Sequence, residues 1–299
     1  MKTYPSYLRL YETGELKERA EKALKSLSSC EVCPHACKVD RTRDEKGVCK
    51  VGRYALVSDY FPHLGEEFPI RGYRGSGTIF FSYCNMRCVY CQNYEISHLG
   101  AGRPVTAREL ADMMLELQDM GCHNVNLVTP SHVVPQILEA LVIAVDEGLR
   151  IPLVYNTSSY DALETLRLLD GIVDIYLADL KYLDEGIARK YSKVKNYPEV
   201  AKKAIKEMYR QVGNLKVDAY GVAVRGLLVR HLVLPNDLST TREVMRFLKS
   251  VDPKLAVNVM AQYRPYWKAF DYPELSRRIT PAEYEKALKE AEGLTLVVD

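Results

Sequence analysis

The sequence has no long hydrophobic run. No apolar segment among its 299 residues approaches the ~18 residues that a membrane-spanning helix needs. Its first residues, MKTYPSYLRLYETGELKERA, also lack the uninterrupted apolar stretch of a secretory signal peptide. From these two absences we expect a soluble, cytoplasmic protein that uses no membrane.

The sequence also lacks an excess of charge of either sign. Lysine and arginine number 41 and aspartate and glutamate 39, which gives a formal net charge of +2. Because so small a charge creates no global field, nucleic acid and anionic membranes are not expected as partners, and an RNA-modifying role has little support. Apolar residues make up 47% of the chain, enough for a large core. The 21 tyrosines, set against few glutamines, favour a thermophilic protein.

Cysteine, by contrast, is abundant and clustered. Seven of the eight cysteines fall into two tight groups, and Cys122 stands alone. Spacings of two and three residues are too short for convenient disulfide pairs, and a reducing cytosol would not keep such pairs oxidised. Clustered thiols in an intracellular protein therefore favour metal or redox chemistry. The groups are Cys30, Cys33, Cys37 and Cys49, followed by Cys84, Cys88 and Cys91.

From Gly75 onward, short β-branched and aromatic runs alternate with helical patterns. The near-continuous apolar character of these runs suits parallel strands that are covered on both faces. Six βα units indicate an α/β fold with a parallel sheet, and both a partial six-stranded barrel and an open doubly wound sheet fit the pattern. The expected strands are residues 77–82, 124–129, 151–156, 172–179, 226–234 and 255–261.

Helix signals are also legible. A helix is expected over residues 14–29, and the turn-rich stretch from Cys30 to about Tyr73 looks too irregular to form a core of its own. Three threonines each precede a glutamate by three residues, the spacing of a capping box at a helix start. These pairs are Thr106 with Glu109, Thr240 with Glu243, and Thr280 with Glu283.

The second cysteine group directly follows the first expected strand, where parallel α/β proteins place their chemistry. The thiolates of Cys84, Cys88 and Cys91 can converge on one compact metal centre. Iron–sulfur clusters usually take four cysteines, so three leave one metal position open to a reacting ligand. A zinc site would need a fourth ligand, a role for which His98 is available.

The segment GTIFFSYCNMRCVYCQN resembles the cluster loop of radical S-adenosylmethionine (SAM) enzymes, and specifically of the pyruvate formate-lyase activating enzymes. The resemblance implies a partial (β/α)6 TIM-like barrel with a [4Fe-4S] cluster on the three cysteines. SAM would chelate the fourth iron, and the reduced cluster would cleave it to methionine and a 5'-deoxyadenosyl radical. A ferredoxin or flavodoxin would be the electron donor.

The resemblance extends over roughly residues 75–265 and implies a set of positions around SAM. Two motifs depart from the family. The stretch Val128 to His132 replaces a glycine-rich turn that ends in Glu, and Asn156 replaces an Asp. Asp179 matches a family position that helps to bind a monovalent cation, and His132 could face SAM or substrate. The implied SAM-binding residues are Tyr90, Gln92, Thr129, Ser131, Asn156, Thr157, Asp179, Lys181, His231 and Gln262.

The first cysteine group offers a complete set of four thiolates, either for a structural zinc ion or for an auxiliary iron–sulfur cluster, and spacing does not separate the two. The whole chain resembles homologues of the activating enzyme that carry an extra cysteine-rich N-terminus. We therefore expect an N-terminal helix and metal-binding extension over residues 1–74, and the barrel with a C-terminal helix and strand over residues 75–299.

Two classes of function follow. The first is a radical SAM oxidoreductase that abstracts hydrogen from an unidentified substrate, either a glycine of a partner glycyl radical enzyme or a small molecule. No catalytic residue beyond the cluster ligands is assigned. The second is a non-catalytic iron–sulfur electron carrier or a metal-dependent interaction protein, which would show redox activity without binding SAM.

Overall fold

The computed structural model describes residues 4–298, and its centre is a mostly parallel sheet. The described strands run in the order β10-β9-β8-β6-β5-β4-β2-β1-β3. Each parallel strand lies beside the next parallel strand in the chain, so the order never reverses as it would in a doubly wound sheet. The parallel strands are β2 (Ser76–Phe81), β4 (Val125–Val128), β5 (Leu153–Thr157), β6 (Ile175–Asp179), β8 (Ala223–Leu232) and β9 (Ala256–Met260).

The α/β fold expected from the sequence is confirmed, as a partial barrel with a cysteine-rich N-terminal extension. All six expected strands form, with boundaries within about three residues. β10 (Thr295–Leu296) adds a further parallel pair to β9, and β7 (Lys216–Val217) pairs with β8. Every residue of β5 is buried, because helices cover one face of the sheet and side chains of the strands pack with Ile70 of a short helix on the other.

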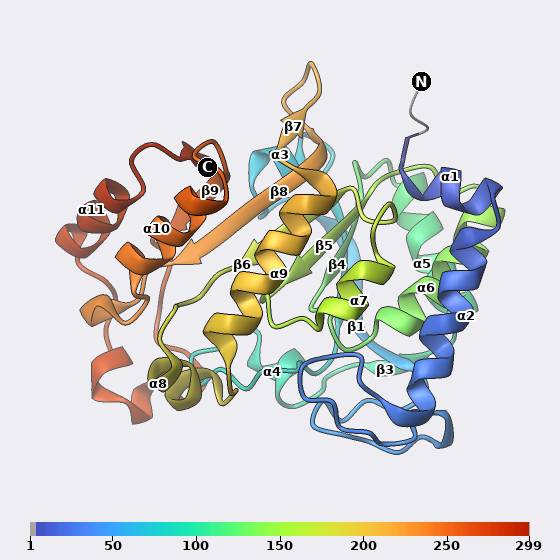
Figure 1. Cartoon of the computed structure of the whole chain (residues 1–299), viewed down its shortest axis with the longest axis horizontal. Helices are drawn as coiled ribbons and strands as arrows, with labels where there is room; N and C mark the ends of the chain where they lie inside the picture. The colour runs from blue at the N-terminus through green and yellow to red at the C-terminus, as the bar shows by residue number, and fades with distance from the viewer. Residues whose placement is uncertain (1–3, 299) are drawn as a thin grey trace.

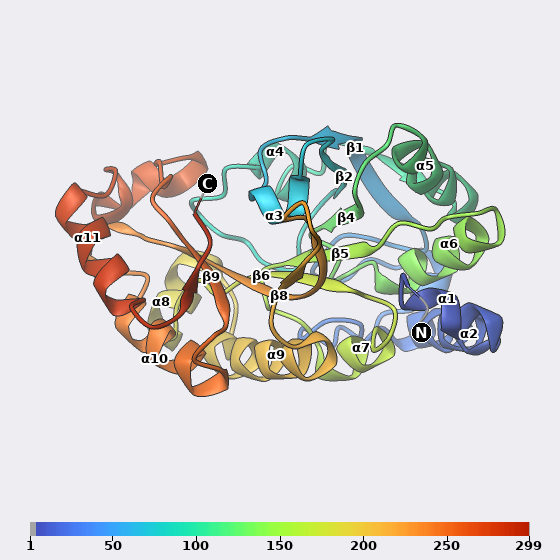
Figure 2. The same ribbon diagram turned by 90° about the horizontal axis from the view of Figure 1, so that it is seen from above.

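The principal helices lie along the outer face of the curved sheet (Figure 2). They are α1 (Tyr7–Glu12), α2 (Glu15–Lys25), α5 (Ala107–Asp119), α6 (Val134–Asp146), α7 (Leu163–Leu168), α9 (Tyr197–Val212), α10 (Thr241–Val251) and α11 (Pro281–Glu290). Short helices are α3 (Phe68–Arg71), α4 (Tyr94–Ser97) and α8 (Glu185–Ile187). The helix expected over residues 14–29 is α2 followed by a 3-10 turn, Ser26–Ser29. No helix in the described part of the chain is long and apolar enough to cross a membrane.

The N-terminal extension contributes a strand that the sequence did not predict. β1 (Ala55–His63) pairs antiparallel with β2 and with β3 (Arg103–Val105). Only one face of this strand is covered, so its sequence has mixed polarity and includes Pro62. For that reason the apolar pattern did not predict it. The expected domain boundary therefore falls between two strands that hydrogen-bond to each other, and one hydrophobic core runs from Tyr7 to Leu294.

Two of the three expected capping boxes form, at Thr106 and at Thr280. The third is wrong. Thr240 lies in the left-handed region with φ 46°, and its side chain makes no cap. Its Oγ1 instead accepts a hydrogen bond from the backbone N–H of Leu183 at 2.8 Å, so a tertiary contact replaces the local one.

Candidate active site

The loops at the carboxyl ends of the parallel strands surround a cavity of about 410 Å³. Parallel strands present these ends at one edge, so residues far apart in the sequence meet there. The residues expected around SAM that line this cavity are Tyr90, Gln92, Thr129, Asn156, Thr157, Asp179, Lys181 and Gln262, together with Cys84, Cys88 and Cys91.

The three cysteines lie on the loop between β2 and α4. Tyr83 begins this loop with φ 62°, a left-handed conformation that is uncommon outside glycine and turns the chain sharply. Each thiol has a polar contact, and Cys84 Sγ has a second one, at 3.8 Å to Asn85 Oδ1. The backbone N–H of Met86 points to Cys84 Sγ at 3.3 Å, Cys88 Sγ lies 3.0 Å from Ser192 Oγ, and Cys91 Sγ lies 3.1 Å from Ser97 Oγ.

All three cysteines are free thiols in the structure. Burial raises the pKa of the Cys84 thiol to about 12, so a metal that binds there must displace a proton. In the described part of the chain, no three His, Cys, Asp or Glu side chains are arranged to hold a single metal ion. His98, the possible fourth zinc ligand, uses its Nε2 to donate a hydrogen bond to the Cys88 carbonyl at 3.0 Å.

The donor set fits the cluster that the sequence implies. Three soft thiol ligands from one loop line a single wall of the cavity, and the rest of the cavity is open to a ligand. In one wall of the cavity, Tyr90 is buried, its hydroxyl lies 3.4 Å from that of Tyr182, and its ring meets Tyr263 edge to face. These aromatic side chains keep water from one side of the thiols.

A half-buried ion pair lies beside the thiols. Lys181 Nζ donates to Asp179 Oδ2 at 2.9 Å, just beyond the end of β6. Burial alone would lower the pKa of Lys181, but Asp179 and the neighbouring Cys88 outweigh burial and hold this pKa above its ordinary value. The ammonium group therefore stays charged and is available to a carboxylate in the cavity.

The turn after β4 is strained at the cavity. Thr129 has φ 60°, which is a genuine outlier for a β-branched residue. Its backbone N–H donates to the Asn156 carbonyl at 3.0 Å, a bond that holds the ends of β4 and β5 together. A residue held in this conformation beside a cavity places its hydroxyl at a fixed position.

Two expected SAM residues lie away from the cavity. Ser131 is buried, with its hydroxyl 3.1 Å from Thr157 Oγ1. His231 is fully buried; its Nδ1 lies 2.8 Å from the Leu180 carbonyl and its Nε2 lies 2.9 Å from Thr241 Oγ1. Adjacent residues of a strand face opposite sides, so it is Arg230 that reaches the cavity.

Sequence reasoning missed a charged cluster on the cavity wall. Arg230 pairs with both Glu66 and Glu67, the latter through bonds of 2.7 and 2.6 Å. Asn126 and Asn258 donate to the same two carboxylates at 3.1 and 2.9 Å. The two glutamates come from the turn-rich stretch before α3, where nothing distinguishes them from solvated acids in the sequence.

The first cysteine group lies outside this cavity. Cys30, Cys33, Cys37 and Cys49 line a separate pocket in the N-terminal extension. His132 lines this second pocket and is absent from the walls of the large cavity, so it does not face a ligand there. Figure 1 shows the cysteine-rich loop, in blue, at the same end of the sheet as α4.

Comparison with known proteins agrees with this geometry. An uncharacterised protein of Methanocaldococcus jannaschii is 35% identical over 291 residues, which cover 94% of this chain and 80% of that protein. Residues 78–248 match the family model of the radical SAM superfamily.

Several solved structures are also similar. Methylornithine synthase is 18% identical with a TM-score of 0.49, over 72% of this chain and 61% of that chain. The FeFe-hydrogenase maturase HydG of Carboxydothermus hydrogenoformans is 14% identical with a TM-score of 0.48, over 72% and 50%. Streptococcus suis SuiB bound to its precursor peptide is 13% identical with a TM-score of 0.48, over 72% and 46%, so this chain spans about half the length of such proteins. The family model covers more than half of the sequence, and the chain belongs to the radical SAM superfamily.

Proposed function

We propose that this chain is a radical SAM enzyme that cleaves SAM reductively and takes a hydrogen atom from a substrate. The observation that carries the proposal is the meeting of three cysteine thiols and the Asp179–Lys181 ion pair in one cavity. When bound, a reduced [4Fe-4S] cluster supplies the electron that splits SAM into methionine and a 5'-deoxyadenosyl radical. A volume of about 410 Å³ lies within the usual range for small-molecule sites.

The residues of the chain have separate roles in this proposal. Cys84, Cys88 and Cys91 hold the cluster and leave one metal position for SAM. Lys181 attracts the SAM carboxylate, and Asp179 keeps the lysine charged and oriented. Thr129, Ser131, Asn156 and Thr157 offer hydroxyl and amide groups to the SAM amino group, either directly or, for Ser131, through Thr157. Asp179 is also the residue that would accept a monovalent cation.

Other residues shape the cavity. Tyr90 and Tyr182 form a dry wall beside the thiols, and exclusion of water protects a reactive intermediate from side reactions. Gln92 and Gln262 lie on the exposed side of the cavity, where Gln262 Nε2 contacts Met260 Sδ at 3.2 Å. His231 does not line the cavity. It hydrogen-bonds to the carbonyl of Leu180, the residue between Asp179 and Lys181, and so helps to fix the position of that ion pair.

For the substrate, we favour a glycine of a partner glycyl radical enzyme, which would make the chain an activating-enzyme-like oxidoreductase of the cytoplasm. The support is the resemblance of residues 77–93 to the cluster loop of such activating enzymes. A ferredoxin or flavodoxin would reduce the cluster. A small-molecule substrate is the alternative, and product analysis with each class of substrate separates the two.

The test is reductive SAM cleavage. The full chain is reconstituted anaerobically with iron and sulfide, mixed with dithionite and SAM, and analysed by mass spectrometry. The proposal predicts 5'-deoxyadenosine and methionine in equal amounts. If a chain with an intact, reduced cluster binds no SAM and forms no 5'-deoxyadenosine, the proposal is wrong, and the electron-carrier function becomes the better account.

A further inference from the structure

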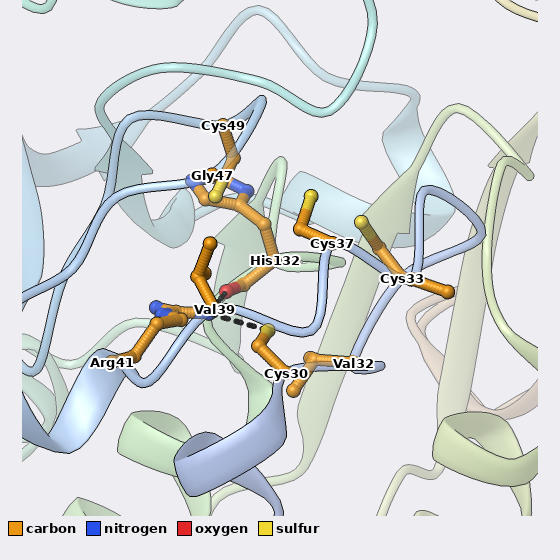
Figure 3. Close-up of a pocket in the computed structure, with 10 residues that line it drawn as sticks. Cys30, Val32, Cys33, Cys37, Val39, Arg41, Gly47, Cys49 and His132 are labelled. Carbon is orange, nitrogen blue, oxygen red and sulfur yellow. Dashed lines mark hydrogen bonds between the residues drawn. The ribbon is translucent and has the colours of Figure 1, made fainter.

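The four N-terminal cysteines surround one buried pocket (Figure 3). Cys30, Cys33 and Cys49 are each no more than 7% exposed, and Cys37 is partly buried. Apolar residues and Gly47 form most of the remaining walls, and the other polar residues that line the pocket are Arg41 and His132. Although no three of the described side chains are arranged around a single ion, four free thiols in one pocket supply the number of ligands that a metal centre takes.

The backbone of this loop lies close to the sulfur atoms. A Cβ at Gly47 would lie 2.7 Å from Cys37 Sγ, so only glycine fits there. The backbone N–H of Val48 points to the same sulfur at 3.5 Å. Backbone N–H groups of His35 and Val51 likewise point to Cys33 and Cys49. Such bonds stabilise a thiolate.

Arg41 adds an independent sign that a negative charge belongs in this pocket. It is 1% exposed, and its Nε and Nη1 donate to the carbonyls of Gly52 and His132 at 2.9 and 2.8 Å. Nη1 also points to Cys30 Sγ at 3.7 Å, and Nη2 has no hydrogen-bond partner. No carboxylate of residues 4–298 forms an ion pair with this guanidinium, although a buried unpaired charge is costly.

His132 carries a second unpartnered atom at the same pocket. Its Nε2 donates to the Ser82 carbonyl at 3.1 Å, which leaves Nδ1 as a buried acceptor without a partner. Burial, with the charge of Arg41, lowers the pKa of His132 to about 3, so the ring is neutral. A neutral ring beside the thiols is compatible with a bound metal.

We propose that Cys30, Cys33, Cys37 and Cys49 hold a second metal centre whose net negative charge is balanced by Arg41. Four thiolates outweigh the charge of either a Zn²⁺ ion or an oxidised [4Fe-4S] core, so both give the required anion. On binding, the S–H bonds break, metal–sulfur bonds form, and the protons pass to solvent. No electron transfer is needed when zinc binds or when a preformed [4Fe-4S] core is transferred to the thiols.

The second centre lies against the catalytic loop. His35 Nε2 donates to the carbonyl of Asn85 at 2.6 Å, directly after Cys84. Arg87, between Cys84 and Cys88, donates to the Val48 carbonyl at 2.8 Å. The second centre therefore braces the loop that carries the catalytic cysteines. This bracing role rests on the proposed function, whereas the presence of the metal does not.

The first test removes the catalytic ligands. The full-length triple variant C84A/C88A/C91A is purified anaerobically, and its zinc, iron and sulfide are measured. The proposal predicts about one zinc, or about four irons with sulfide, per chain. An iron result identifies an auxiliary cluster, a zinc result a structural ion. A folded triple variant that retains neither metal overturns the proposal, whatever the SAM-cleavage assay shows for the natural chain.

The second test uses the charge of Arg41. The melting temperature is measured for the metal-loaded and metal-free forms of R41M, in which a side chain of similar length has no charge. The proposal predicts that metal raises the melting temperature less in R41M than in the natural chain. The control is R43M, since Arg43 is exposed and pairs with Asp40 at 3.4 Å in the same turn. Equal metal-dependent shifts in R41M, R43M and the natural chain would overturn the role of Arg41.

Discussion

The molecule contains two cysteine-rich loops that differ in what surrounds them. The loop after β2 presents three thiols to a cavity of about 410 Å³ that also contains the Asp179–Lys181 pair. The N-terminal loop encloses four thiols in a small pocket with apolar walls. An incomplete thiol set beside an open cavity leaves a metal position for a bound ligand, whereas a complete set of four thiols leaves none.

The two sites also differ in how a buried guanidinium is neutralised. Arg230, in the wall of the open cavity, has two carboxylate partners, Glu66 and Glu67. Arg41, in the closed pocket, has none among the described residues and points instead to the sulfur of Cys30. The carboxylates of the protein neutralise the charge of Arg230. The charge of Arg41 has no such partner, so we expect a bound anionic centre to neutralise it.

The largest expected effect separates the catalytic thiols from an ordinary buried thiol. C84A should abolish SAM cleavage, because loss of one of three ligands releases the cluster. C122A is the matched control, since Cys122 is buried outside both sites. It should cleave SAM at the natural rate. Formation of 5'-deoxyadenosine and iron content are measured together, and undiminished cleavage by C84A would contradict the assignment.

Substitution of Arg230 tests the paired guanidinium. R230M should lower the free energy of unfolding of the metal-free chain by about 3–5 kcal/mol near pH 7, because two buried carboxylates lose their cation. Burial tends to raise the pKa of Glu67, but Arg230 outweighs it and holds this pKa below its ordinary value. The natural chain thus gains stability from Glu67 above the unfolded pKa and loses that stability as pH falls through the folded pKa.

The pH dependence gives this substitution its control. In R230M the carboxylate of Glu67 loses the cation that lowers its pKa and keeps the burial that raises it, so it becomes neutral as the pH falls. The difference in stability from the natural chain should therefore shrink between pH 7 and pH 4. Urea unfolding at both pH values measures it. R41M, measured in the same metal-free state, should change the free energy of unfolding little, because no carboxylate loses its cation when Arg41 is replaced. A larger loss of stability in R41M than in R230M would contradict this difference between the two arginines.

Substitution of Lys181 tests whether the open cavity binds a carboxylate. K181M should raise the KM for SAM roughly tenfold or more, in line with ~1.5–3 kcal/mol for a hydrogen bond to a charged group. Iron content should not change, because Lys181 holds no metal in this account. K203M is the control, since Lys203 is exposed on α9, far along the chain from the cavity residues. An unchanged KM in K181M would remove the lysine from the SAM site.

The smallest expected effect is at Gly47 in the closed pocket. G47A should destabilise the metal-loaded chain by about 1–3 kcal/mol, since the added Cβ presses on Cys37 Sγ. The measurement is the fraction of metal retained at the N-terminal site during dialysis against a chelator. The same retention as in the natural chain would show that the sulfur can move aside.

The sequence predicted the parts of the molecule that repeat a strong pattern. Six strands were found because each is a near-continuous apolar run, and the cysteine loops were found because thiols at short spacing are rare. β1 was missed because it is covered on one face only, and Thr240 was misjudged because its hydroxyl bonds Leu183 in another loop. Glu66 and Glu67 gain their meaning only from Arg230, which is distant in the chain, so no local pattern could reveal them.

The central claim is that only the three-cysteine loop leaves a metal position for SAM. The direct measurement is the electron paramagnetic resonance spectrum of the reduced chain before and after addition of SAM. The account predicts that SAM changes the spectrum of the natural chain and of a variant without Cys30 and Cys33, but not that of C84A. A spectrum that SAM leaves unchanged in the natural chain, with its cluster intact, would contradict the account.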